Sequence, residues 1–253
     1  MIKKTLQKIL LAAVAVSLVA CASPDSRSRA ERKMDMARLK TQLAVEYMRM
    51  QDYRNAVQAI NEAIQAESGF DYAWMIKGII YQSLKSNDEA EVAFRQALSI
   101  SPKSAEINNN YGWFLCSSGR PTAAIPYFDR ALEDPTYPTP HIATMNKGIC
   151  AGRAGQYGEA ASYLAKARAT APWFAPVIKE IARLQLMQGQ NGNALKLMNQ
   201  YQSKVEVLGP DDLLLGWKIA RANGDTQAAY EYEATLRTRF PGSDEMKEIT
   251  GGF

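Results

Sequence analysis

Few residues of this chain could carry catalytic or metal-binding chemistry. The 253 residues include one histidine, His141, and three cysteines, Cys21, Cys116 and Cys150. Metal sites built from histidine and cysteine need several such ligands together. The sequence contains neither a G-x-S-x-G nucleophile turn nor a G-x-x-x-x-G-K-[ST] phosphate loop. His141 follows the stretch YPTP and is expected to be a structural residue at a repeat junction. We therefore expect no enzyme, metal, cofactor or small-molecule substrate.

Cys21 ends an N-terminal segment that is typical of an export signal. Residues 1–8 carry three lysines and no acid, and residues 9–20 carry no charge. This order of charged, apolar and small residues indicates a secretory signal. A membrane span is excluded by length, because twelve helical residues rise only about 18 Å and a hydrocarbon core needs about 30 Å. The alternative is a buried N-terminal helix, which is disfavoured because no polar residue patterns the run.

The segment LVAC, residues 18–21, resembles the bacterial lipobox. The resemblance implies cleavage before Cys21 and acylation of that cysteine, which would hold the mature protein on a membrane. The residue directly after Cys21 is Ala22 and not an aspartate, and in enterobacterial lipoproteins this usually accompanies export to the outer membrane. We thus predict a signal peptide over residues 1–20 and a lipidated N-terminus with a flexible tether over residues 21–36.

The charge balance argues against a nucleic-acid partner. The chain has 30 basic and 26 acidic residues, and removal of the three signal-peptide lysines leaves 27 against 26, a net charge of +1. Proteins that bind nucleic acid electrostatically present a strong excess of basic residues. The hydrophobic content of 47% is ample for a folded core.

A repeat unit of about 34 residues runs through the rest of the chain. Residues 71–104 resemble the tetratricopeptide repeat (TPR) except at position 7, where Lys77 replaces leucine; the matching residues are Trp74, Gly78, Tyr81, Ala90, Phe94, Ala97 and Pro102. The resemblance implies antiparallel helix pairs in an all-α, right-handed superhelical solenoid. The alternative is a generic helical bundle with chance periodicity. We predict six repeats, over residues 37–70, 71–104, 105–140, 141–174, 175–208 and 209–242, with a C-terminal tail over 243–253.

Stability in such an array arises between neighbouring repeats. The fifth and sixth repeats match the pattern less well, so we expect them and the tail to be the most mobile part.

Cys116 and Cys150 lie late in the first helices of adjacent repeats, and an exported protein meets an oxidising compartment. We predict a Cys116–Cys150 disulfide. Two buried thiols are the alternative, because cysteine is also a good small core residue.

The TPR resemblance also implies a concave surface, formed mainly by the first helix of each repeat. Carrying over the family's inward positions, with a flanking amide and two rim residues, gives an apolar and aromatic strip: Tyr72, Met75, Ile79, Asn109, Trp113, Met145, Asn146, Ile149, Trp173, Phe174 and Trp217. Such a strip suits an extended or helical peptide with apolar anchors. It differs from TPR grooves that clamp a carboxylate with several inward lysines and arginines. Ordinary packing between repeats is the alternative for each residue.

The segment EINNNYGWFLCSSGRPTAAIPYFDRALEDPTYPTP resembles the third repeat of the PilF/PilW family of type IV pilus lipoproteins, most specifically over residues 109–116. The family implies an outer-membrane lipoprotein that faces the periplasm. Its members promote assembly or localisation of the outer-membrane secretin, or stabilise pilus fibres. The alternative function is a TPR lipoprotein adaptor of another envelope machine, for outer-membrane protein insertion or peptidoglycan synthesis.

Overall fold

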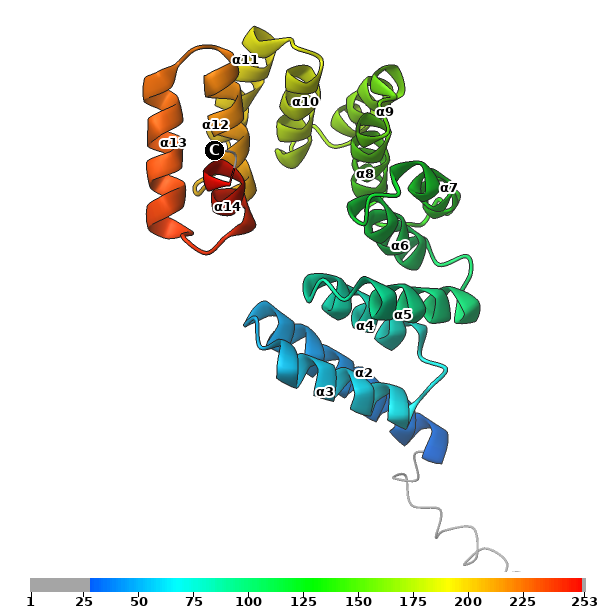
Figure 1. Ribbon diagram of the computed structural model, residues 1–253. Coiled ribbons are helices and arrows are strands. Elements are labelled where there is room, and N and C mark those ends of the chain that lie inside the picture. Colours follow the sequence, from blue (N-terminus) through cyan, green and yellow to red (C-terminus); the bar gives the residue numbers. More distant parts are fainter. Residues whose placement is uncertain (1–27, 252–253) are drawn as a thin grey trace, which may run out of the picture.

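The computed structural model describes residues 28–251, and the chain in that range folds into stacked antiparallel helix pairs (Figure 1). The first helices of the pairs are α2 (Arg29–Arg49), α4 (Asp71–Ser83), α6 (Ala105–Ser117), α8 (Pro140–Arg153), α10 (Pro176–Met187) and α12 (Pro210–Ala222). The second helices are α3 (Tyr53–Ala66), α5 (Asn87–Ile100), α7 (Pro121–Leu132), α9 (Tyr157–Thr170), α11 (Asn191–Gln202) and α13 (Thr226–Arg239). A short helix, α14 (Asp244–Thr250), follows, and no strand occurs between residues 28 and 251. The predicted all-α solenoid is confirmed.

The first helix begins earlier than the sequence interpretation placed it. Ser28 and Glu31 form a capping box, in which the Ser28 hydroxyl oxygen accepts from the Glu31 N–H at 3.1 Å and the Glu31 carboxylate accepts from the Ser28 N–H at 2.7 Å. This arrangement satisfies two N–H groups that a helix start otherwise leaves unpaired. The flexible tether predicted for residues 21–36 is therefore wrong from Arg29 onwards, where the chain is helical. The predicted signal peptide and Cys21 lie outside the described residues.

The turns within the pairs use a left-handed backbone. The last four pairs have a glycine there with φ between 73° and 81°, namely Gly119, Gly155, Gly189 and Gly224. Glycine adopts such angles without the steric penalty of a Cβ atom. The first two pairs reach the same geometry with Gln51 and Lys85, both at φ 60°.

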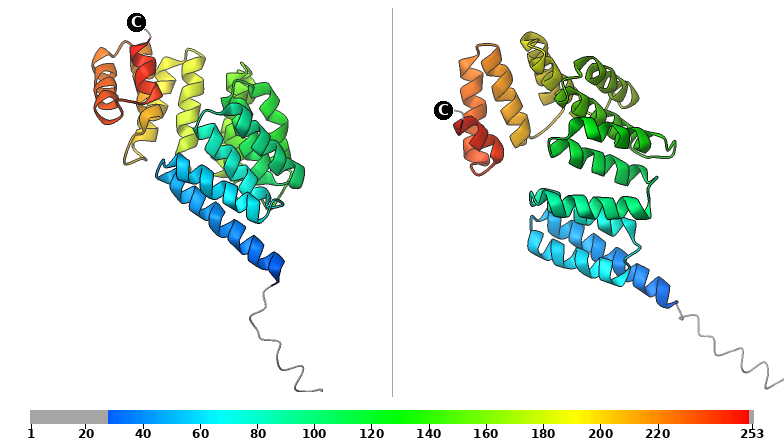
Figure 2. Two further views of the ribbon diagram at one scale, coloured as in Figure 1. Left: turned by 60° about the horizontal axis from the view of Figure 1, so that its bottom comes forward. Right: turned by 45° about the vertical axis from the view of Figure 1, so that its right-hand side comes forward.

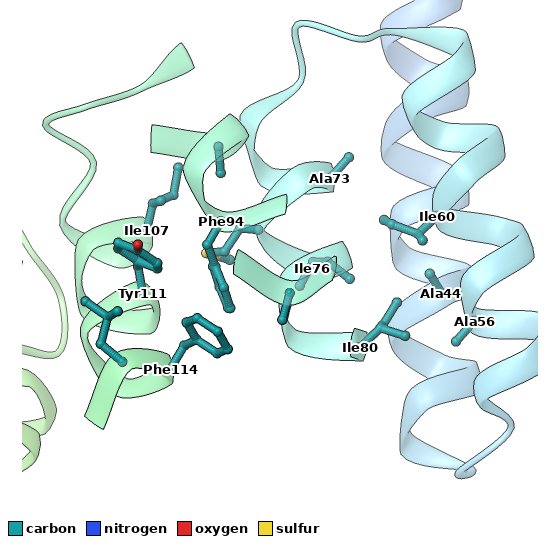
Figure 3. Packing of buried hydrophobic residues seen from close by; sticks show 14 of the residues in the cluster. Ala44, Ala56, Ile60, Ala73, Ile76, Ile80, Phe94, Ile107, Tyr111 and Phe114 are labelled. Carbon is teal, nitrogen blue, oxygen red and sulfur yellow. The ribbon is translucent and has the colours of Figure 1, made fainter. Parts of the chain in front are cut away.

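Close approach of the two helices within a pair depends on small residues of the first helix. A Cβ atom added to Gly78 would lie 2.8 Å from Phe94, and one added to Gly148 would lie 2.9 Å from Leu164. The core continues between pairs: Figure 3 shows Ile60 and Ile80 at the boundary of the first two pairs. Each pair thus buries its apolar face against its neighbours, as expected for a solenoid.

The C-terminal segment contains a packed helix, although the sequence interpretation treated it as a mobile tail. Met246 and Ile249 of α14 are buried against leucines of α12 and α13. In addition, Lys85 Nζ lies 2.5 Å from Asp244 Oδ2, which joins α14 to the distant turn between α4 and α5. Helix α14 therefore covers apolar surface that the last pair would otherwise expose.

Candidate partner-binding groove

The stacked pairs follow a curved path that gives the molecule an inner and an outer side. The even-numbered helices α6, α8, α10 and α12 lie on the inner side of the arc, and α7, α9, α11 and α13 lie outside them (Figure 1). Two further views show the same stacking order, with the first and last pairs at opposite ends (Figure 2). The inner side is thus formed by the first helices of the repeats, as the TPR resemblance implied.

Aromatic and aliphatic side chains on the inner helices remain partly accessible. Trp113 of α6, Ile149 of α8 and Trp217 of α12 are partly buried, as are Tyr72 and Ile79 of α4. Arginines lie over both tryptophans: the guanidinium of Arg153 is 5.3 Å from the Trp113 ring centroid, and that of Arg221 is 4.9 Å from the Trp217 ring centroid. These contacts orient the rings by cation–π attraction.

Met75 and Met145, both assigned to the groove from the repeat pattern, lie in the core instead. Only 1% of the Met75 surface and 9% of the Met145 surface is exposed, and each belongs to a buried apolar cluster. Both occupy repeat position 5, which in this solenoid packs between neighbouring inner helices. Their assignment as contact residues for a partner is wrong for the described structure.

Asn109 and Asn146 are also buried, and they bind each other. The side-chain amide of Asn146 donates to the Asn109 side-chain oxygen at 3.1 Å. This bond joins α6 to α8 and satisfies polar atoms that would be costly to bury unpaired. The two amides therefore hold adjacent repeats together, which was the alternative that their sequence positions left open.

Trp173 and Phe174 lie in the loop between α9 and α10. Trp173 is 77% exposed, whereas Phe174 is partly buried and its ring meets that of His141 edge-on, with the centroids 5.0 Å apart. His141 thus packs at the junction of the fourth and fifth repeats. The role of Trp173 as a rim contact stays a prediction.

A charged network between α10 and α12 was missed by the sequence interpretation. Lys179 binds Asp211 at 3.0 Å and Asp212 at 2.8 Å, while Arg183 binds Asp211 at 2.7 Å. Removal from water lowers the pKa of Lys179, but the two aspartates outweigh this effect and raise it above its usual value. The Tyr201 hydroxyl, 3.1 Å from Asp212 Oδ1, completes the network. The signal available in the sequence was Tyr201 itself, which replaces the small residue usual at repeat position 27.

Acidic residues lie at the opposite end of the inner helices from Arg153. Asp71 and Glu106 occupy the first turns of α4 and α6, where the helix dipole favours negative charge. Partial removal from water, and then the charge of Asp71, raise the pKa of Glu106. The inner side thus has acidic residues near helix starts and basic residues near helix ends.

Cys116 and Cys150 join α6 to α8 in the structure, with their Sγ atoms 2.15 Å apart and their Cα atoms 5.7 Å apart. Trp113 lies one turn before Cys116, and Arg153 lies one turn after Cys150.

Among residues 28–251, no group of three or more histidine, cysteine or acidic side chains is placed to hold a metal ion. No helix in the same range is long and apolar enough to span a bilayer.

Comparison with known sequences defines the class of this fold. Two sequence models of the tetratricopeptide repeat match the chain, one over residues 41–105 and 115–173 and the other over residues 153–205. Together with the stacked helix pairs, these matches define an all-α TPR solenoid.

Two relatives then define the family. A crystal structure of PilW, described as a widely conserved type IV pilus biogenesis factor, is 55% identical, with a TM-score of 0.72 over 85% of this chain and 98% of that chain. The type IV pilus assembly protein PilF of Pseudomonas aeruginosa is 24% identical over 251 residues, which is 97% of this chain and 98% of PilF. The P. aeruginosa PilF structure shares the fold, at 22% identity and a TM-score of 0.65 over 87% of this chain and 99% of that chain. The chain belongs to the PilF/PilW family of TPR proteins.

Proposed function

We propose that this protein is a non-enzymatic scaffold lipoprotein of type IV pilus biogenesis. In this proposal the inner groove is the inner side of the arc around Tyr72, Ile79, Trp113, Ile149 and Trp217. It binds a segment of a partner protein, foremost the outer-membrane secretin, and promotes multimerisation or localisation of that partner. Other pilus assembly proteins are further partners, and fibre stability follows from the same contacts. The 55% identity to PilW over nearly all of that chain carries the pilus assignment.

The groove supports binding rather than catalysis. Trp113, Ile149 and Trp217 offer partly accessible apolar surface on the inner helices α6, α8 and α12. Aromatic anchors in a concave surface are typical of peptide recognition. TPR solenoids of this kind are typically non-enzymatic.

The anchor in this proposal is Cys21. The sequence LVAC at residues 18–21 supports cleavage and lipidation there. Acyl chains contribute about 0.8 kcal/mol per buried CH₂, so two or three chains hold a protein on a membrane durably. The solenoid would then face the periplasm from the outer membrane. A Cys21→Ala protein should fold normally but leave the membrane fraction, and its continued presence in the outer membrane would place the anchor elsewhere.

Deletion of the gene tests the pilus role. Membranes from deleted and complemented cells are run unheated on a gel, where the secretin multimer survives, and surface fibres are counted by electron microscopy. The proposal predicts loss of the high-mass secretin multimer or of the fibres, restored by complementation. Normal secretin together with normal piliation would reject it and favour an adaptor of another envelope assembly machine.

A further inference from the structure

The N-terminal end of the solenoid exposes an apolar stripe on α2. Met36, Leu39 and Leu43 are 47%, 60% and 38% exposed, and their i, i+3, i+7 spacing places them on one helix face. Leu43 stands at repeat position 7, where Leu215 of the sixth repeat is buried among residues of the preceding repeat. The end repeats of a solenoid normally present a polar outer face. At the C-terminal end α14 covers the core, but at the N-terminal end the stripe is left uncovered.

The stripe begins close to the proposed membrane anchor. Helix α2 has 21 residues and α3 has only 14, and the first turns of α2 project beyond α3 (Figure 2). Residues 22–28 separate Cys21 from α2, and a chain of that length spans at most about 25–30 Å. A lipid on Cys21 would therefore keep the start of α2 within about 25–30 Å of the membrane surface.

Basic residues lie on the same side of α2 as the stripe. Arg29 and Lys33 are exposed, and they precede Met36 by seven and three residues, which are the spacings of one helix face. Four of the first ten residues of α2 are basic and two are acidic. Of these acids, Glu31 is held in the capping box at the helix start, and Asp35 lies about 100° around the helix from Met36. An apolar stripe flanked by an excess of positive charge is typical of helices that lie on an anionic lipid surface.

We propose that the α2 stripe, defined by Met36, Leu39 and Leu43, lies against the lipid surface of the membrane that holds the anchor, with Arg29 and Lys33 on its anionic headgroups. A second copy fits this face less well, because two chains anchored in one membrane would align their α2 helices in parallel and bring the same basic residues together. Three apolar side chains are too few to retain the protein on a membrane without acyl chains. The contact instead orients the anchored solenoid, with its later repeats directed away from the bilayer. The inference rests on the lipid anchor of the proposed function.

Quenching of a fluorophore by labelled lipids can test this contact. The mature chain from residue 22 carries an N-terminal hexahistidine tag, which binds a nickel-chelating lipid in vesicles and takes the place of the natural anchor. The fluorophore NBD is attached to a new cysteine, introduced as Leu39→Cys in the stripe or as Arg38→Cys, which is exposed about 100° around the same helix. Val92→Cys, at a residue 66% exposed on the outer helix α5, is the distant control. In non-reducing buffer the disulfide leaves the new cysteine as the free thiol.

The position of the label should determine the quenching. In vesicles of phosphatidylethanolamine and phosphatidylglycerol that contain doxyl-labelled lipid, we expect quenching at residue 39 to be at least about twofold stronger than at residue 38, because an interfacial helix buries its apolar face about 5–10 Å deep. A label at residue 92 should not be quenched. Equal quenching at residues 38 and 39 would overturn the proposal. So would an unquenched label at residue 39, which would leave the stripe to a protein partner.

Removal of the stripe should weaken the contact. Met36→Gln/Leu43→Gln, with the label at residue 39, should reduce quenching at least about twofold, because α2 loses apolar surface. Both side chains are exposed, so the fold should persist, and circular dichroism verifies it. Unchanged quenching in this folded variant would refute the role of the stripe.

Removal of the basic residues should also weaken the contact in anionic vesicles. Arg29→Gln/Lys33→Gln should reduce quenching at residue 39 at least about twofold. Lys166→Gln/Lys196→Gln removes two exposed positive charges from the outer helices α9 and α11, so it should leave quenching unchanged. Equal effects of the two charge variants would contradict a local contact at α2.

Other occupants of the stripe give different results. Pairing with a second copy would shift NBD emission at residue 39 to shorter wavelength as the protein-to-lipid ratio rises, without quenching by lipid, and would overturn the proposal. The nickel anchor separates this contact from natural acylation. Quenching at residue 39 together with an unlipidated Cys21 in cells would reject the anchor of the proposed function, whereas a lipidated Cys21 without quenching at residue 39 would reject the α2 contact.

Discussion

Gly78 of α4 lies so close to the Phe94 ring of α5 that a Cβ atom at residue 78 would be 2.8 Å from Cδ2 of that ring. A side chain at this position must push the two helices apart, so Gly78→Ala should lower the free energy of unfolding by about 1–3 kcal/mol. Gly158→Ala is the matched control, because its Cβ atom would meet nothing within 4 Å and alanine favours the helix. Urea unfolding measures both. A Gly78→Ala protein as stable as Gly158→Ala would contradict the packing described for the repeats.

The bond between Cys116 and Cys150 closes a loop between two residues that are 34 apart in sequence. Thiol titration of the denatured, non-reduced mature chain carrying Cys21→Ala should find no free thiol. The double variant Cys116→Ser/Cys150→Ser should lose about 3–4 kcal/mol of stability by the chain-entropy estimate. Two titratable thiols in the unsubstituted protein would show that the predicted disulfide does not form.

Asp211 and Glu106 should affect stability with opposite dependence on pH. Removal from water raises the pKa of Asp211, but Arg183 and Lys179 outweigh it, and the net pKa lies below the usual 3.8. Ionised Asp211 therefore stabilises the fold above about pH 4, and this contribution is lost as the pH falls through the lowered pKa. The raised pKa of Glu106 has the reverse effect: its ionised form opposes folding at neutral pH, and the penalty disappears as the pH falls through the raised pKa.

Denaturant unfolding from pH 7 to pH 3 measures both contributions. Asp211→Asn should lower the free energy of unfolding at pH 7. It should also reduce the loss of stability below pH 4, because the Asp211 carboxyl that titrates in this range is absent. Glu106→Gln should be as stable as the unsubstituted protein or slightly more so at pH 7. Parallel pH curves for Asp211→Asn and the unsubstituted protein would contradict the ion-pair assignment.

Helix α14 should stabilise the last repeat despite its short length. Met246 is 5% exposed and packs against the leucines of α12 and α13, so Met246→Ala should cost about 2–4 kcal/mol of the stability of that repeat. Lys247→Ala, on the exposed side of the same helix, should change stability by less than about 1 kcal/mol. Hydrogen exchange reports the opening of α13 and α14 in each variant. Equal protection in both would mean that α14 does not cover the end of the core.

The spacing of repeat residues made much of the fold predictable. Residues of the same type as Gly78, Phe94 and Ala97 recur at a fixed sequence spacing, because the two helices of every pair pack against each other in the same way. The start of α2 was missed because its many charged residues resemble a tether. Ser28 and Glu31 match the capping-box pattern S-x-x-E, so the helix start could have been predicted from these two residues alone.

Accessibility in the groove was harder to predict than the helices. Met75 and Asn109 occupy an inward position of the repeat, yet both are buried because the neighbouring inner helix covers that position. The Lys179–Asp211 pair depends on how α10 and α12 are aligned, which no single repeat encodes. Contacts between repeats that depend on helix alignment therefore required the structure, whereas the Cys116–Cys150 pair could be predicted because both residues lie at matching places in adjacent repeats.

Substitution of aromatic residues in the inner groove shows whether this surface serves secretin assembly. Cells that produce Trp113→Ala or Tyr72→Ala at normal levels are compared with cells that produce Tyr230→Ala, which removes a 68% exposed ring from the outer helix α13. The high-mass secretin multimer is quantified in unheated membranes, after circular dichroism has verified each fold. We expect a reduced amount of multimer with the two groove variants and a normal amount with Tyr230→Ala. A normal amount of multimer with both folded groove variants would contradict it.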